Sequence, residues 1–283
     1  MKIGAVMFFT AGSMRPGPLA QALEARGFES LWVPEHTHIP SSRRSAYPAT
    51  GGLVQAYYEL FDPFLALNAA AAATRTLKVG TGIALIPQRD PIVTAKMVSS
   101  LDVLSDGRFL FGVGNGWNQD EVENHGTDFK TRHKLARERI EAMKRIWTED
   151  EPEYQGELVR FGPMKQWPKP VQRPHPPIIV GGAFPHAARR AVRYGDGWIP
   201  RDDWLERDGV GVIEQFHAMA RDAGRDPASL PISLFRVPPD IERLRLYRRL
   251  GIDRVVFSLP AEPAEAILPI LDRWAALQRE LAG

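Results

Sequence analysis

The 283-residue sequence contains no cysteine, which excludes disulfide bonds and catalytic thiolates. No apolar run approaches the roughly 20 residues that a membrane-spanning helix needs. The amino terminus has no apolar segment and small-residue cleavage site of the kind found in secretory signals. The formal net charge is only +2, and no basic stripe points to nucleic acid or an anionic membrane as a partner. These absences lead us to expect a cytoplasmic protein that acts on a small molecule.

Short apolar runs alternate along the chain with segments of helical spacing. This alternation predicts a (β/α)8 barrel, in which active sites lie in the loops that follow the strands. The eight runs expected to form the strands are Ile3–Phe9, Ser30–Val33, Leu77–Ile86, Arg108–Val113, Pro177–Val180, Gly197–Pro200, Ile232–Val237 and Arg254–Leu259. With 44% hydrophobic residues, we expect residues 1–283 to form a single barrel domain.

Two segments are too long to be plain connections between a strand and a helix. Residues 37–59 follow the second predicted strand, and we expect them to form a lid, because long loops in compact domains are often binding loops. Residues 150–176 precede the fifth predicted strand, and they are expected to form a short hairpin followed by a proline-rich strap. Helix starts are clear at Asp62-Pro63 and Asp90-Pro91, where a capping carboxylate precedes a proline in the first turn.

Two glycine-rich segments follow predicted strands. Gly181 and Gly182 lie between a buried strand and an Ala/Arg-rich helix, where free backbone N–H groups favour a phosphate. A tight turn without a ligand is the alternative. Residues 112–116 match a dinucleotide fingerprint only weakly, because their glycines have G-x-G-x-G spacing and no strand-terminal acid follows. These glycines can still bring the backbone close to a flat ligand, with Asn115 and Asn118 as hydrogen-bonding groups. An empty glycine-rich strand end is the alternative.

Histidines and aromatic residues also follow predicted strands. His36 and His38 are two residues apart, but no further ligand has metal-site spacing, so we predict no metal. A histidine at the end of a strand is better suited to hydrogen bonding or acid–base chemistry, which we expect of His36. A loop histidine in water is the alternative, and it fits His38 better. Trp117 and other aromatic residues could line a flat pocket, although ordinary packing explains any single one. His125, His133 and Lys134 are expected at the surface.

Taken together, these segments resemble the luciferase-like monooxygenase superfamily, specifically its branch of oxidoreductases that use the deazaflavin coenzyme F420. The resemblance covers essentially the whole chain. It rests on Gly27–His36, Val79–Ile83, Asp102–Arg108, Lys169-Pro170, Val180–Ala183 and Tyr194–Ile199, in this order and spacing.

The resemblance implies a (β/α)8 barrel with insertions and assigns roles to individual residues. His36 resembles the catalytic histidine beside the reactive edge of the cofactor ring. Gly82 and Ile83 resemble a non-prolyl cis peptide that backs the ring. The cofactor's ribityl and phosphate arm is assigned to Gly114, Asn115 and Asn118, and its phosphate to Gly181, Gly182 and Ala183. We add Glu35 to the cofactor site and His38 and Trp117 to the substrate site.

One position departs from the family pattern. Sugar-phosphate dehydrogenases of the F420 branch have a glutamate where this chain has Asn115, so we do not expect a sugar phosphate as substrate. The expected activity is hydride transfer between F420 and an apolar or aromatic organic substrate. Arg43 and Arg44 are candidates for contact with the anionic F420 tail, or for a solvated charge pair. The resemblance further implies a homodimer, and a separate flavin or F420 reductase is a candidate partner protein.

Three alternatives remain open. The first is a monooxygenase that uses reduced FMN. The identity of the bound cofactor, FMN or F420, would distinguish this activity from hydride transfer. The second is a non-catalytic flavin-binding subunit, which could lose His36 without consequence. The third is a barrel hydrolase or aldolase, which predicts carboxylates or lysines at the strand ends, where this chain has glycine, asparagine and histidine.

Overall fold

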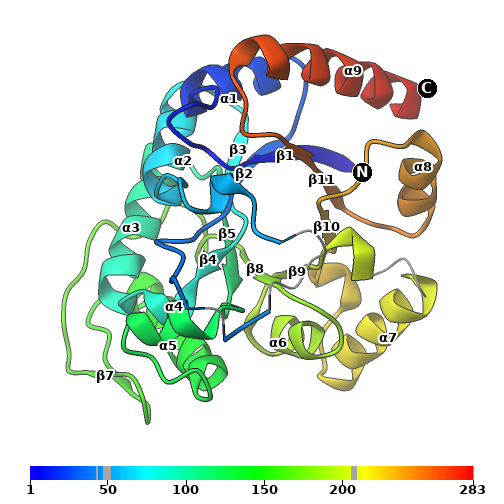
Figure 1. Ribbon diagram of the computed structural model, residues 1–283. Helices are drawn as coiled ribbons and strands as arrows, with labels where there is room; N and C mark the ends of the chain where they lie inside the picture. The colour runs from blue at the N-terminus through cyan, green and yellow to red at the C-terminus, as the bar shows by residue number, and fades with distance from the viewer. Residues whose placement is uncertain (43, 47–51, 205–208, 283) are drawn as a thin grey trace.

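The computed structural model describes residues 1–42, 44–46, 52–204 and 209–282, and it shows a barrel of parallel strands inside a ring of helices (Figure 1). Neighbouring strands follow the order β10, β11, β1, β2, β3, β5, β8, β9. Their bounds are β1 Lys2–Met7, β2 Ser30–Val33, β3 Lys78–Thr81, β5 Phe109–Gly114, β8 Ile178–Gly181, β9 Gly197–Ile199, β10 Ser233–Phe235 and β11 Arg254–Leu259. Parallel bridges Trp198–Ile232 and Arg201–Phe235 join the two ends of this order, so the barrel closes as predicted.

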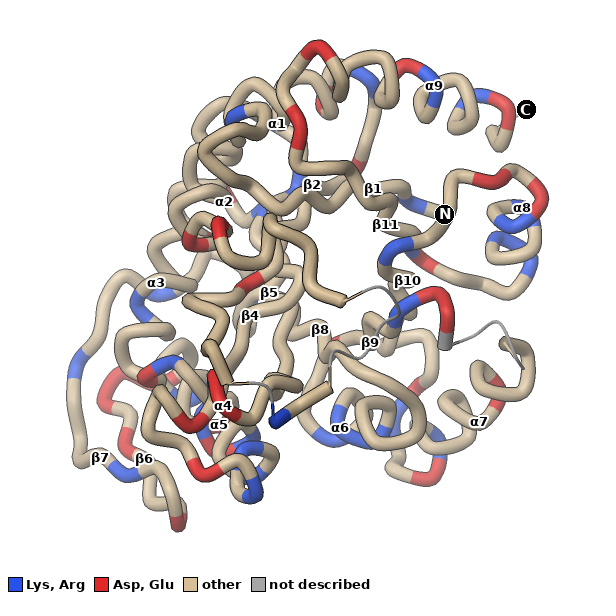
Figure 2. Tube along the Cα trace, in the orientation of Figure 1, with Lys and Arg blue, Asp and Glu red and all other residues tan. Residues whose placement is uncertain are grey.

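The helices cover the outside of the barrel (Figure 1). They are α1 Pro16–Glu24, α2 Pro63–Ala72, α3 Pro91–Leu104, α4 Gln119–Asn124, α5 Arg132–Thr148, α6 His186–Tyr194, α7 Gly209–Asp222, α8 Ile241–Arg249 and α9 Ala264–Ala282, with short 3-10 turns η1 Gln55–Tyr57, η2 Ile86–Gln88, η3 Asp202–Trp204 and η4 Pro227–Ser229. The predicted caps are confirmed: Asp62 accepts hydrogen bonds from the N–H groups of the first turn of α2, and Asp90 does the same for α3. Basic and acidic residues are interspersed over the outer helices (Figure 2).

Two clusters of apolar side chains form the core, one outside the barrel strands and one inside them. The larger lies between the strands and the helices and includes Phe109, Phe111 and Trp147, all almost fully buried. The smaller takes residues from six strands, namely Val6, Trp32, Leu110, Ile179, Ile199 and Val256. Half-buried Ile83 and Phe235 pack on this smaller cluster and form its boundary with the pocket described below. The barrel interior is therefore a packed core with a pocket above it, as in other barrels of this kind.

The third predicted strand is wrong in one respect. The run Leu77–Ile86 is not continuous, because β3 ends at Thr81 and a separate strand, β4 (Ala84–Leu85), pairs with β5. Gly82 and Ile83 lie between the two strands, and the peptide bond that joins them is cis. Glycine in a strand run is typical of such interruptions.

The insertion before β8 has the predicted hairpin and strap. Strands β6 (Tyr154–Gln155) and β7 (Arg160–Phe161) pair antiparallel. The strap that follows is held by the buried Asp102 carboxylate, which accepts hydrogen bonds from the N–H groups of Val171 and Gln172 at 2.8 and 2.9 Å. Among the described residues, no helix is both long and apolar enough to cross a membrane.

Candidate active site

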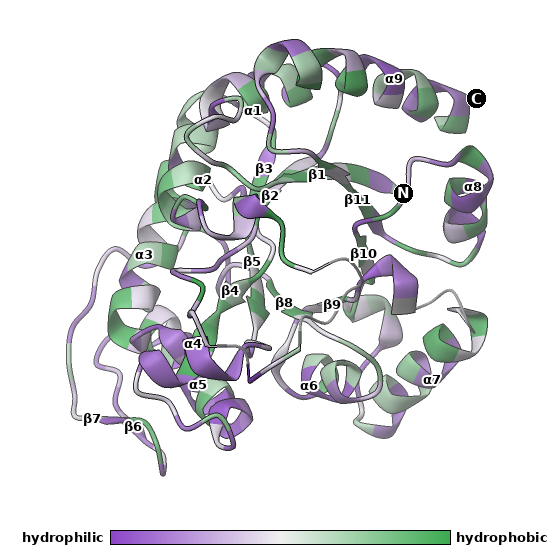
Figure 3. Cartoon of the chain, in the orientation of Figure 1, coloured by the Kyte–Doolittle hydropathy of each residue, from purple (hydrophilic) through white to green (hydrophobic). Residues whose placement is uncertain are grey.

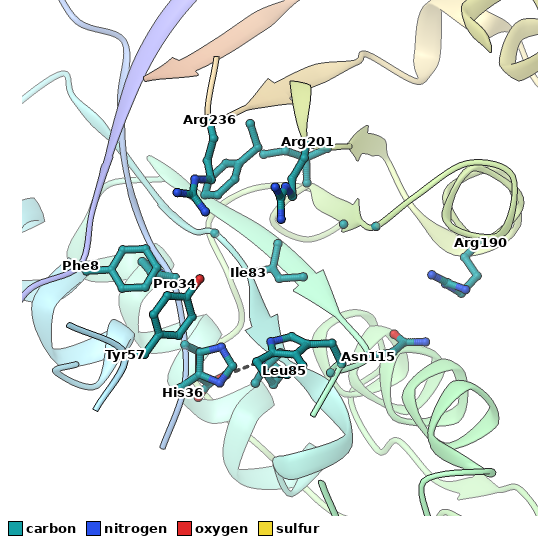
Figure 4. Close-up of a pocket in the computed structure, with 18 of the residues that line it drawn as sticks. Phe8, Pro34, His36, Tyr57, Ile83, Leu85, Asn115, Arg190, Arg201 and Arg236 are labelled. Atoms are coloured by element: carbon teal, nitrogen blue, oxygen red, sulfur yellow. Dashed lines mark hydrogen bonds between the residues drawn. The ribbon is translucent and has the colours of Figure 1, made fainter. Parts of the chain in front are cut away.

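A cavity of about 310 Å³ opens at the carboxyl ends of the barrel strands (Figure 4). This is the end of the barrel at which enzymes of this fold carry their active sites, and the volume lies within the range of small-molecule sites. Its lining combines aromatic and aliphatic side chains with one buried carboxylate, two histidines and three arginines: Phe8, Pro34, Glu35, His36, Tyr57, Gly82, Ile83, Leu85, Asn115, Gly116, Trp117, His133, Gly181, Gly182, Arg190, Ile199, Arg201, Phe235 and Arg236.

His36 follows β2 and is fixed by a carboxylate from α4. Its Nδ1 lies 2.7 Å from Oε2 of Glu121, and the two side chains are 8% and 1% exposed. A carboxylate accepts a hydrogen bond, so Nδ1 carries the hydrogen and Nε2 is left for a ligand. Figure 3 shows α4 as a strongly hydrophilic helix, yet Asp120 and Glu121 in its first turn are buried. The helix therefore brings acidic side chains inward to the site.

A second buried carboxylate holds the wall of the pocket. Glu35 Oε2 accepts a hydrogen bond from the N–H of Leu85 at 2.6 Å, and Oε1 accepts one from Arg89 Nε at 2.7 Å. The Arg89 guanidinium also lies over the Phe64 ring, 4.7 Å from its centre. Burial lowers the pKa of Arg89, but the Glu35 carboxylate outweighs this and raises it above its ordinary value. The pair ties the end of β2 to the segment that follows Gly82 and Ile83.

Ile83 forms the floor of the pocket, and two glycines on neighbouring strands make room for its side chain. A Cβ atom on Gly114 would lie 1.9 Å from Ile83 Cδ1, and one on Gly181 would lie 2.7 Å from the same atom. Any larger residue at either position would displace Ile83. Gly82 is enclosed by Phe235 and Trp32, with 3.0 and 3.2 Å left for an added Cβ. The result is an aliphatic surface flanked by aromatic rings, which suits a flat ligand.

Positive charge gathers at one end of the floor, where β8 leads into α6. Arg190 of α6 lines the pocket beside Gly182, and its Nε is buried with no hydrogen-bond partner in the described chain. Burial lowers the pKa of Arg190. The pKa of His133 falls to about 4 because of burial and the nearby positive charges of Arg132, Arg190 and His186. Several positively charged side chains therefore lie together here, and the buried Nε–H of Arg190 has no partner among the described residues. An oxyanion would complete this environment.

His133 is oriented toward this end by Asn115. The two side chains meet at 2.6 Å, between Asn115 Nδ2 and His133 Nδ1. With its pKa near 4, His133 is neutral at pH 7, so Nδ1 accepts the amide hydrogen and Nε2 carries the remaining one. Gly182 has a φ of +125°, a conformation that favours glycine. A phosphate could thus be surrounded by the backbone of Gly181 and Gly182, the Arg190 side chain and the N–H of His133. These residues fit the phosphate arm of a flavin or deazaflavin.

The luciferase-like monooxygenase family model matches residues 17–238. The chain belongs to this family. An uncharacterized protein of Mycobacterium tuberculosis is 39% identical over 282 residues, 98% of each chain. The F420-dependent hydroxymycolic acid dehydrogenase of the same organism is 28% identical over 214 residues, 75% of this chain and 55% of the relative. The FMNH2-dependent dimethylsulfone monooxygenase of Pseudomonas putida is 34% identical over 142 residues, 49% of this chain and 39% of the relative.

Solved structures agree on the fold of the luciferase-like family. The monooxygenase RslO1 from Streptomyces bottropensis has a TM-score of 0.82 at 22% identity and covers 100% of both chains. An F420-dependent secondary alcohol dehydrogenase has a TM-score of 0.75 at 18% identity and covers 99% of both chains. The protein is therefore a luciferase-like oxidoreductase of the class that uses a flavin or a deazaflavin.

The structure brings most of the residues predicted for the luciferase-like site into one cavity. Those that line it are Glu35, His36, Gly82, Ile83, Asn115, Trp117, Gly181 and Gly182. The remaining ones lie outside the lining. Gly114 lies behind Ile83, Asn118 is buried just before α4, and Ala183 is exposed. His38 bonds to Asn124 at 2.9 Å, with its ring 5.5 Å from that of His125.

Other residues of the site were missed or misplaced by sequence reasoning. His133 was expected at the outer surface, but it faces the pocket, because the first turn of α5 lies beside the end of β5. Glu121, Arg190, Arg201 and Arg236 were not predicted at all. Arg44, a candidate for contact with the cofactor tail, pairs with Asp120 and with Glu123 at 2.6 Å, while Arg43 lies outside the described residues. For Arg201 the sequence did offer a signal, because the charged run Arg201-Asp202-Asp203 directly follows the predicted strand Gly197–Pro200.

Proposed function

We propose that this protein is an F420-dependent oxidoreductase that transfers a hydride between the deazaflavin and an organic substrate. The observation that carries the proposal is the His36–Glu121 pair beside the aliphatic floor of Ile83, together with a buried Arg190 Nε that has no partner among the described residues. A ring on the floor would place its phosphate arm toward Gly182 and its reactive edge toward His36. The relationship to the F420-dependent hydroxymycolic acid dehydrogenase supports this cofactor.

When bound, F420 would donate or accept the hydride at carbon five of its ring, which is chemistry that the cofactor supplies. The residues of this chain bind and orient the cofactor and exchange a proton with the substrate. Ile83 supports the ring, and Gly181, Gly182, Arg190 and His133 hold the phosphate. His36 exchanges a proton with the substrate oxygen or nitrogen through Nε2, and Glu121 keeps the imidazole in the required tautomer and stabilises its charged form.

The predicted lid, residues 37–59, contributes Tyr57, which covers His36 in the pocket. Tyr57 of η1 is buried, and its ring lies 5.3 Å from the His36 ring and 4.8 Å from the Phe8 ring. Trp117 completes this side, 6.0 Å from His36 with the rings nearly perpendicular. These aromatic contacts exclude water from the histidine, which strengthens its electrostatic interaction with Glu121.

A monooxygenase that uses reduced FMN is the second candidate. It is favoured by the 34% identity to the dimethylsulfone monooxygenase, although that relationship covers only 49% of this chain. The pocket would hold the two cofactors through the same phosphate contacts. The choice between them therefore depends on their rings and on the longer F420 tail.

Equilibrium titration separates the two candidates. Purified protein is titrated with oxidised F420 and with FMN while the cofactor fluorescence is recorded. We expect F420 to bind at least tenfold more tightly than FMN; stronger binding of FMN would assign the protein to the monooxygenases. Gly182→Glu should abolish binding of both, because its carboxylate would occupy the phosphate position. Gly251→Glu is the matched control, since Gly251 also has a positive φ, of 75°, with open space around it and a place outside the pocket.

A further inference from the structure

Arg236 occupies an unusual position at the mouth of the pocket. It directly follows β10 and has a φ of 63°, in the left-handed region where glycine and asparagine are more common than arginine. The backbone is fixed on both sides, since Phe235 N–H donates to Pro200 O at 2.9 Å and Val237 N–H donates to Val256 O at 3.0 Å. The flanking strands β9 and β11 therefore hold this residue in place. Such backbone conformations gather at ligand sites.

The charge of Arg236 has no counterpart in the described chain. Its side chain is exposed, lines the pocket and has no hydrogen bond or ion pair with another described residue. Its neighbour Arg201, joined to the same strand end by the Arg201–Phe235 bridge, is paired with Asp203 at 2.6 Å. Figure 4 shows the two guanidinium groups extending in the same direction, toward the level of Ile83. The Arg201–Asp203 pair is close to neutral, and Arg236 adds a full positive charge.

Arg236 and the phosphate end are separate parts of the cavity. Arg190 comes from α6 and neighbours Gly182, whereas Arg236 comes from the end of β10, on the other side of Ile83 (Figure 4). The wall formed around Arg236 by the ends of β9 and β10 combines Arg201 with the apolar side chains of Phe235 and Ile199. In the proposed function the cofactor's phosphate lies at Arg190, across Ile83 from this wall. The wall is therefore available to the substrate.

We infer that Arg236 binds a carboxylate of the substrate, so that the substrate is an organic acid with an apolar or aromatic body. This inference rests on the proposed function and narrows it, because it adds a carboxylate to the apolar or aromatic substrate expected from the sequence. The guanidinium fork matches a carboxylate in two parallel hydrogen bonds. The apolar wall receives the body of the acid, and the carboxylate fixes the reacting carbon between the cofactor floor and His36.

Ligand-observed NMR titration tests the inference with benzoate and its uncharged analogue benzamide. Both probes are titrated into the free protein and into protein saturated with F420. We expect benzoate to bind in both states, and benzamide to bind at least about tenfold more weakly, because the amide does not pair with the cation. Arg236→Met should weaken benzoate by about tenfold or more and change F420 affinity less than twofold. Arg75→Met, at an exposed arginine outside the pocket, is the control and should change neither.

Several results would overturn the inference. Absence of benzoate binding, equal binding of benzamide, or unchanged benzoate affinity in Arg236→Met would each remove Arg236 from substrate recognition. Displacement of benzoate by F420, or a large loss of F420 affinity in Arg236→Met, would assign the residue to the cofactor instead. If F420 fails to bind, the proposed function falls, while benzoate binding to the free protein still decides the role of Arg236.

Discussion

His36 Nδ1 and Glu121 Oε2 are 2.7 Å apart, and both side chains are almost completely withdrawn from solvent. The carboxylate comes from α4 rather than from the end of a barrel strand. Asn115 provides no carboxylate to the pocket, whereas Glu121 reaches it through its contact with His36. Glu121 Oε1 is buried and has no partner among the described residues.

The first prediction concerns the tautomer of His36. In the native protein at neutral pH, the uncharged imidazole should carry its hydrogen on Nδ1, where Glu121 accepts it. Glu121→Leu removes the acceptor at similar volume, and the Nε2–H form should then predominate. Nitrogen-15 NMR of the histidine side chains distinguishes the two forms. An unchanged tautomer in Glu121→Leu would show that the carboxylate does not orient the ring.

The second prediction concerns the phosphate end. Arg190→Gln should weaken F420 binding by about tenfold to a hundredfold, the loss expected for a hydrogen bond to a charged group. Arg189→Gln is the matched control, because Arg189 is the preceding residue of α6 and is exposed. The dissociation constants come from fluorescence titration. Equal affinities for the two variants would place the phosphate elsewhere.

The third prediction is a pH dependence of cofactor binding. The pKa of His133 is about 4 in the free protein, and an adjacent phosphate favours the protonated ring, so the pKa must rise in the complex. A group that binds its proton more tightly in the complex makes binding stronger as the pH falls. F420 affinity should therefore increase from pH 7 toward pH 5, and His133→Gln should flatten this dependence. An identical pH profile in the variant would exclude His133 from the phosphate contacts.

The fourth prediction concerns the buried ion pair that fixes the pocket wall. Arg89→Met leaves Glu35 buried without its main partner and should lower the free energy of unfolding by about 3–5 kcal/mol. Arg26→Met breaks the solvent-exposed pair with Asp272, which should cost about 1 kcal/mol or less. Urea denaturation measures both. Similar losses in the two variants would show that the Glu35–Arg89 pair contributes no more than a surface pair.

The sequence allowed the barrel to be predicted because buried parallel strands leave short apolar runs and each Asp-Pro pair marks a helix start. Gly181, Gly182 and His36 could be assigned because each lies at or just past the carboxyl end of a strand. Glu121, His133 and Arg190 could not, since they lie within helices, where a charged residue usually indicates a solvent-exposed face. Only the closure of the barrel brings these helical positions to the pocket. Arg236 follows a strand, but its backbone conformation has no signal in the sequence.

The central claim is that the floor of Ile83 carries a deazaflavin whose phosphate lies at Gly182 and Arg190. A crystal structure of the protein with F420 tests it most directly. The claim predicts phosphate oxygens within hydrogen-bond distance of the Gly182 N–H and the Arg190 guanidinium, with carbon five of the ring facing the His36 side of the pocket. A phosphate located at Arg201 and Arg236, or a ring bound outside the cavity, would contradict it.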